Sequence, residues 1–249
     1  MRVTLKTERQ IEKMRTAGRL LAYVHRQLHR ALRPGMSTLD IDRLGEELIR
    51  SCGCVPNFKN YEGYPASICV SVNDEVVHGI PAPDRILREG DIVSLDAGLI
   101  YKGYHSDAAR TWGIGRISEE DARLIRAARE CFFAGISKAK EGAWLCKISG
   151  GVEDCARKYG FGIVRELAGH GIGSSLHEDP EILNYRTGRP GIRLKAGMTL
   201  AVEPMITSGK PDISVLEDDW TIVTDDGSNA AHYENTILIT PDGCEVLSI

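Results

Sequence analysis

Two aspartates on either side of one hairpin carry the first chemical signal in this sequence. Asp96 and Asp107 lie in two β-type runs, residues 92–100 and 104–112, and the turn between them contains Gly103. Counting outward from the turn predicts that the two carboxylates are direct cross-strand neighbours, about 5 Å apart. Two ionised carboxylates that close among apolar residues repel each other unless a cation lies between them. The hairpin therefore predicts a metal site, and the alternative is a pair of solvated aspartates beside the turn.

Further candidate ligands follow in separate segments of the second half. His170 lies between two glycines, and Glu203 and Glu234 come from separate short strands. Each of the three alone also fits an ordinary turn or solvent-facing position. Together, two aspartates, two glutamates and a histidine supply the hard oxygens and the imidazole that two divalent ions about 3.5–4 Å apart require. Such a pair lowers the pKa of a bridging water and positions hydroxide as a nucleophile, so the set indicates metal-assisted hydrolysis.

Four helical patterns and the strands between them must position these residues. Thr7 begins a long apolar periodicity over residues 8–32, and Ser37 begins a second helix. After the hairpin, Ser118 begins a helix that should reach about residue 139, and a shorter helix is predicted over residues 145–159. Two β-type runs precede the hairpin, at residues 67–72 and 75–78.

Other residues that can bind metals carry weaker signals. His25 and His29 lie one turn apart on the first predicted helix, but neither has an acidic partner nearby in sequence. We therefore expect solvated histidines on the helix surface. The seven cysteines lack the paired spacing of a zinc site, and their odd number favours reduced thiols.

Glycine spacing indicates an internal repeat. Three pairs of residues share an offset of 107 positions: Gly35 and Gly142, Gly90 and Gly197, and Asp96 and Glu203. Two helix-helix-strand halves related by a pseudo-twofold axis, with a site at their junction, would explain this offset. Chance spacing of glycines is the alternative.

Composition limits the classes of protein that the chain can belong to. With 249 residues, 42% of them hydrophobic and 27% charged, the sequence is typical of a soluble globular protein. The formal net charge of −4 argues against a protein that binds nucleic acid through a basic face. No apolar run approaches the roughly 18 residues of a membrane span. A cytoplasmic protein is expected.

The segments that hold the candidate ligands resemble the methionine aminopeptidases of type I. These belong to the pita-bread family, peptidase family M24, which also contains prolidases and aminopeptidase P. The resemblance covers nearly the whole chain and is carried by residues 73–81, Trp220 and the segments around Asp96, Asp107, His170, Glu203 and Glu234. It implies an α+β pita-bread fold, in which two pseudo-twofold halves, about residues 1–113 and 114–249, surround a curved antiparallel sheet. The chain would be a single catalytic domain over residues 1–249.

The resemblance also implies a role for each ligand. Asp107 and Glu234 would bridge two divalent ions, which are Co, Mn, Fe or Zn. Asp96 would complete one coordination sphere, and His170 with Glu203 the other. Glu203 would in addition carry a proton from water to the leaving amine.

Residues around the metals would bind the substrate. By resemblance, His78 and His177 hold the peptide group and assist the tetrahedral intermediate. The methionine pocket would be lined by aromatic and sulfur-bearing side chains, namely Tyr61, Tyr64, Cys69 and Trp220. A nucleophilic role for Cys69 is the rival interpretation, but nothing near it in sequence would stabilise a thiolate.

Four positions depart from the family pattern. The segment that includes Gly98 also resembles the proline-peptidase branch, Leu176 stands where phenylalanine is common, and Glu62 stands where histidine is often found. His232 replaces the usual glutamine. It should point to the same face as Glu234, and we hypothesise that it lies behind the ligands and adds a pH dependence near neutrality. A purely structural histidine is the alternative.

The implied function is removal of the initiator methionine from nascent proteins whose second residue is small. Two alternatives remain open from sequence: an Xaa-Pro peptidase of the same fold, and a catalytically inactive binding module. The expected partners are the N-termini of peptides and nascent chains, and docking on the ribosome is left open. We expect a monomer with no membrane partner and no direct nucleic-acid specificity.

Overall fold

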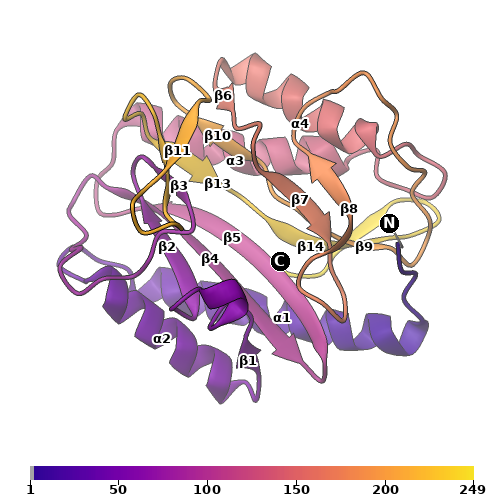
Figure 1. Cartoon of the computed structure of the whole chain (residues 1–249), viewed down its shortest axis with the longest axis horizontal. Helices are drawn as coiled ribbons and strands as arrows, with labels where there is room; N and C mark the ends of the chain where they lie inside the picture. Colours follow the sequence, from indigo (N-terminus) through magenta and orange to yellow (C-terminus); the bar gives the residue numbers. More distant parts are fainter. Residues whose placement is uncertain (1–2) are drawn as a thin grey trace.

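The computed structural model describes residues 3–249 and places two pairs of helices on opposite sides of a set of antiparallel strands (Figure 1). The helices are α1 (Glu8–Ala31), α2 (Thr38–Ser51), the short 3-10 helix η1 (Tyr61–Gly63), α3 (Glu119–Ile136) and α4 (Cys146–Tyr159). The first pair, α1 and α2, packs on the N-terminal strands, and α3 and α4 pack on each other and on later strands. Within residues 3–249, no helix is long and apolar enough to cross a membrane.

Within residues 3–249, fifteen strands make up four antiparallel groups. They are β1 (Val55–Pro56), β2 (Ile68–Val72), β3 (Glu75–Val77), β4 (Ile92–Tyr101), β5 (Tyr104–Gly113), β6 (Gly162–Ile163), β7 (Ala168–Gly171), β8 (Glu178–Leu183), β9 (Thr199–Val202), β10 (Met205–Thr207), β11 (Ile213–Val215), β12 (Ile222–Thr224), β13 (Ala230–His232), β14 (Asn235–Ile239) and β15 (Cys244–Val246). In the first group β4 pairs with β1, β2 and β5, and the largest group has the order β15-β14-β9-β7-β8. The remaining groups are β13-β10-β6 and β11-β12-β3.

The predicted helices are confirmed to within a few residues. Local hydrogen bonds explain where they begin: the Ser37 hydroxyl accepts from the Asp40 N–H at 3.1 Å, and the Ser118 hydroxyl accepts from the Asp121 N–H at 3.0 Å. The third helix ends at Ile136, short of the predicted residue 139, because the chain tightens there into a turn in which the Ala139 N–H bonds the Ile136 carbonyl.

The predicted pairing of Asp96 with Asp107 is wrong by two residues. Asp107 faces Gly98, and Asp96 faces Ala109. The hairpin turns on only two residues, Lys102 and Gly103, with φ of +48° and +79°. Lysine rarely adopts a positive φ, so the sequence did not indicate this two-residue turn. The aspartates are therefore diagonal neighbours on one face of the hairpin.

Matched hydrogen bonds support the predicted internal repeat. The N–H of Gly35 donates to the Leu87 carbonyl at 2.8 Å, and the N–H of Gly142 donates to the Leu194 carbonyl at 2.9 Å. Both glycines have positive φ, +89° and +79°. The donor and the acceptor of the second hydrogen bond each lie 107 positions after those of the first. We propose on this basis that residues 1–113 and 114–249 are the two repeated halves of one domain.

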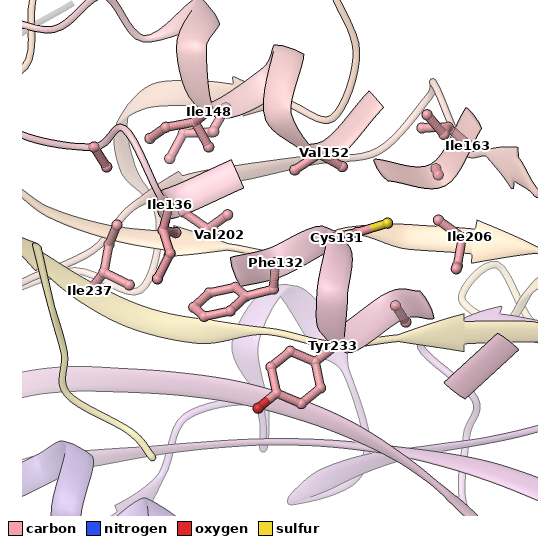
Figure 2. Close-up of a cluster of buried hydrophobic side chains, with 14 of the residues drawn as sticks. Cys131, Phe132, Ile136, Ile148, Val152, Ile163, Val202, Ile206, Tyr233 and Ile237 are labelled. Carbon is pink, nitrogen blue, oxygen red and sulfur yellow. The ribbon is translucent and has the colours of Figure 1, made fainter. Parts of the chain in front are cut away.

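Each helix pair covers its own hydrophobic cluster. Figure 2 shows the cluster beneath α3 and α4, where the side chains of Phe132, Ile136 and Val152 meet those of the strands. The Phe132 ring lies 5.5 Å from that of Tyr233, centroid to centroid. Tyr233 directly precedes Glu234, so this cluster anchors the segment that carries a candidate ligand.

His25 is buried, contrary to the prediction that it is solvated, whereas His29 is exposed as predicted. The His25 Nε2 lies 2.8 Å from the carbonyl of Ala108, to which it donates. This burial could not be predicted from the sequence, because the covering residues Ala108 and Trp112 lie far along the chain.

Replacing His25 with glutamine should reduce the loss in the free energy of unfolding that accompanies a fall in pH from 7 to 5. Burial, together with the Arg110 charge, lowers the pKa of His25 to about 3 from its usual 6.5. Below pH 6.5 the unfolded chain binds a proton that the folded protein does not, so stability is lost as pH falls from about 6.5 toward 3. Between pH 7 and 5 this loss is about 2 kcal/mol. Urea unfolding of the metal-free proteins at both pH values measures it, and equal losses in parent and variant would contradict the assignment.

Candidate metal centre and substrate pocket

A shared break in two strand pairs presents two glutamates to one cavity. Glu203 and Pro204 separate β9 from β10, and the chain is interrupted at Glu234 between β13 and β14. The β9–β14 pair on one side of the break and the β10–β13 pair on the other have the same register. Glu203 therefore lies opposite Glu234. Proline has no N–H to continue the ladder, and the Glu234 N–H bonds the Ala109 carbonyl of β5 instead, at 2.9 Å.

Three of the five predicted ligands form a compact group. Single ligand atoms of Asp107, His170 and Glu234 all lie within 4.8 Å of one another. The Glu203 carboxylate lies 3.6 Å from His170 Nε2, and the Asp96 carboxyl is within hydrogen-bonding reach of Asp107. All five side chains line a cavity of about 150 Å³. The structure thus brings the five predicted side chains together at one cavity.

Electrostatics favour a cation in this group. Burial raises the pKa of Asp96 to about 7. The pKa values of Asp107, Glu203 and Glu234 lie well above the usual range, mainly because of burial and to a smaller extent because neighbouring carboxylates repel them. Asp96 Oδ1 and Glu234 Oε1 are buried without a hydrogen-bond partner in residues 3–249. Buried carboxylate oxygens without donors are the groups that divalent cations bind. The donor set therefore fits a metal cofactor.

His170 is oriented for ligation. Its Nδ1 lies 2.9 Å from the carbonyl of Gly171, so Nδ1 carries the proton and Nε2 is left with a free lone pair facing Glu203. Burial lowers the pKa of His170 to about 4, which keeps the imidazole neutral, as a metal ligand must be.

Neighbouring side chains fix the strands that carry the ligands. The Thr236 hydroxyl accepts from the Asp107 N–H at 2.9 Å and donates to the Asp107 carbonyl at 3.0 Å. The partly buried Arg110 guanidinium donates to the Glu234 carbonyl and, at 3.1 Å, to the Ser248 carbonyl. These contacts tie Asp107 of β5 to β14, and they tie Glu234 to β5 and to the C-terminal segment.

Two further histidines, His78 and His177, line the cavity. The His177 ring packs edge-on against that of His170, with 4.3 Å between centroids, and its Nδ1 lies 2.8 Å from the Tyr61 hydroxyl. His78 follows β3 with φ of +60°, which ends the strand one residue earlier than predicted and turns the ring toward the cavity wall. Burial lowers the pKa of His78 to about 4 and lowers that of His177, so both are neutral at pH 7.

The predicted pocket residues Tyr61, Tyr64, Cys69 and Trp220 line the same cavity. The rings of Tyr64 and Trp220 meet edge to face at 5.1 Å. Burial raises the pKa of the Cys69 thiol well above its usual range, so Cys69 is a poor nucleophile and acts as part of the wall.

The sequence did not single out Phe58, which also lines this cavity together with Leu176 and Glu62. Its only signal was its place in an aromatic-rich loop. Leu176 and Glu62, recognised as departures from the family pattern, are therefore wall residues.

His232 lies behind Glu203, with 3.7 Å between Nε2 and the carboxylate. It ends β13, and the break before β14 separates it from Glu234. Burial lowers the pKa of His232 to about 3, because the ring is fully enclosed and lies near His78 and Arg110. A neutral imidazole at pH 7 argues against the hypothesised pH dependence near neutrality.

The fold and this carboxylate–imidazole cluster define a metal-dependent hydrolase of the pita-bread class. The chain belongs to metallopeptidase family M24, whose model matches residues 12–241. Its relatives include the methionine aminopeptidase of Clostridium acetobutylicum, 48% identical over 99% of both chains, and methionine aminopeptidase 1 of Bacillus subtilis, 44% identical over 99% of both.

Solved structures agree with this assignment. The crystal structure of methionine aminopeptidase from Thermotoga maritima superposes with a TM-score of 0.97, at 42% identity and 99% coverage of both chains. The prolidase from Pyrococcus furiosus, at 22% identity and a TM-score of 0.80, shares the fold. The match covers 98% of this chain but only 65% of the prolidase chain. The predicted fold class and family are confirmed.

Proposed function

We propose that this protein is a methionyl aminopeptidase, which hydrolyses the first peptide bond of proteins that begin with methionine when the second residue is small. The observation that carries the proposal is that one cavity of about 150 Å³ is lined by both the carboxylate–imidazole cluster and the aromatic and sulfur wall. The cavity is smaller than the roughly 300 Å³ at which pockets for drug-sized ligands begin. It has room for one amino-acid side chain beside the cluster, as an exopeptidase requires.

Divalent cations, when bound, lower the pKa of water and polarise the scissile carbonyl. We propose two of them, Mn, Co, Fe or Zn, held by Asp96, Asp107, His170, Glu203 and Glu234. Glu203 lies at the edge of the group and is our candidate to accept a proton from water and return it to the leaving amine.

The side chains around the cluster would select and orient the substrate. His78 and His177 are neutral N–H donors at the cavity wall and would stabilise negative charge on the carbonyl oxygen during hydrolysis. Tyr64, Cys69 and Trp220 would enclose the methionine thioether, which binds well to aromatic edges. We further propose that the protein acts in the cytoplasm, as a monomer, on nascent N-termini, with or without docking on the ribosome.

A paired-substrate assay tests the function. Metal-stripped protein reconstituted with Mn or Co is offered Met-Ala-Ser and Ala-Pro-Ser peptides, with a metal-free control. We expect methionine to be released from the first peptide only, and only with metal. Cleavage of the proline peptide alone would make the protein an Xaa-Pro peptidase. Failure to cleave either peptide despite bound metal would favour a binding module.

A further inference from the structure

A lysine near the N-terminus forms a buried ion pair beside the cavity. The Lys6 Nζ donates to Glu178 Oε2 at 2.6 Å, and the two side chains are only 5% and 10% exposed. The Thr4 hydroxyl donates to the same oxygen at 2.6 Å. Glu178 directly follows His177, so the N-terminal segment reaches the segment that carries this histidine.

The same carboxylate orders the turn that leads to His177. Glu178 Oε1 accepts from the Ser175 N–H at 3.3 Å and from the Ser174 hydroxyl at 3.4 Å. A Cβ on Gly173 would lie 2.4 Å from Lys6 Cε and 2.5 Å from Glu178 Oε1, so the turn packs directly on the ion pair. Residues 173–178 are therefore in direct contact with the Lys6–Glu178 ion pair.

The backbone of Lys6 is itself anchored to the strand that leads to Glu203. Its N–H donates to the Gly197 carbonyl at 2.8 Å, just before β9. The backbone of Lys6 is thus bonded to the segment that leads to Glu203, and its ammonium is bonded to Glu178. Removing the ammonium would leave the Glu178 carboxylate buried without its counter-ion, which is strongly unfavourable.

We infer that Lys6 is a positioning residue of the active site: through Glu178 it fixes the ring of His177 against the cavity. The inference rests on the proposed function, in which His177 contacts the substrate. A displacement of about 1 Å at such a group can lower the rate about a hundredfold. Lys6 itself does not line the cavity.

Steady-state kinetics on Met-Ala-Ser in two backgrounds test this inference. Lys6→Met should lower kcat/KM by about ten- to a hundredfold in the parent, and Lys6→Arg should restore most of it. In a His177→Ala background, Lys6→Met should change kcat/KM by less than about twofold, because the group it positions is gone. The control is Lys59→Met, which breaks an exposed pair with Glu46 (2.7 Å) and should leave kcat/KM unchanged.

A second variant and a non-kinetic readout keep the test decisive. Thr4→Val removes the exposed hydroxyl that donates to Glu178 and accepts from Lys6 Nζ, while it keeps the Lys6–Glu178 ion pair, and should lower kcat/KM about threefold in a folded protein. In the zinc-loaded protein labelled with ¹⁵N-histidine, the His177 ring signals should shift in Lys6→Met but not in Lys59→Met. An equal loss of activity in both backgrounds, or unshifted His177 signals, would overturn the inference. A parent that releases no methionine would instead count against the proposed function, and the NMR comparison would still decide the role of Lys6.

Discussion

Replacing Glu203 with glutamine should lower kcat/KM for Met-Ala-Ser about a thousandfold, within the range of roughly 10²–10⁴ for a general acid–base group. Glutamine keeps the size of the side chain but can neither carry the proton nor supply an anionic oxygen to a cation. The Asn184 amide holds the Glu203 backbone carbonyl at 3.0 Å, so the backbone should stay in place after the change.

The matched control is Glu181→Gln. Glu181 is an exposed carboxylate in a wider groove that His170 and Glu203 also line, and its replacement should leave kcat/KM within about twofold of the parent. Circular dichroism and thermal unfolding of the metal-loaded proteins check that both variants fold. A loss of less than tenfold in folded Glu203→Gln would exclude Glu203 as the proton carrier.

Sequence was sufficient for the features that local chemistry determines. Helix starts at Ser37 and Ser118 follow from side chains that bond an N–H three residues away, and both were predicted. Apart from Phe58, the residues around the cavity were named from the sequence through the resemblance to the family, because each stands in a short segment with a recognisable pattern. The structure adds that these segments meet at one cavity.

Features that depend on long-range contacts could not be predicted from the sequence. The hairpin register depends on Lys102 adopting a positive φ, which its residue type disfavours. His25 is buried by residues more than 80 positions away, and Lys6 gains its role from Glu178, which is 172 positions away. Such contacts appear only when the two halves of the chain are packed together.

Replacing Asp96 with asparagine should stabilise the metal-free protein at pH 8, by about 2–4 kcal/mol, while it weakens metal binding. Burial raises the pKa of Asp96 from 3.8 to about 7. Between these two values the folded protein holds a proton that the unfolded chain has released, so the contribution of Asp96 to stability falls as pH rises through this window. At pH 8 the parent carries the full penalty of a buried negative charge next to Asp107, and asparagine has no proton to lose.

Urea unfolding with a chelator at pH 8 and pH 5 measures this effect, and the advantage of Asp96→Asn should shrink by more than half at pH 5. With saturating Mn the order should reverse, because the parent gains more stability from binding the cation than a variant that lacks one ligand. The exposed Asp84→Asn change controls for the amide substitution and should alter stability by less than about 0.5 kcal/mol. A metal-free Asp96→Asn protein that is less stable than the parent at pH 8 would mean that the cluster tolerates its charges without a cation. The mutual repulsion of these carboxylates would then no longer support a metal site.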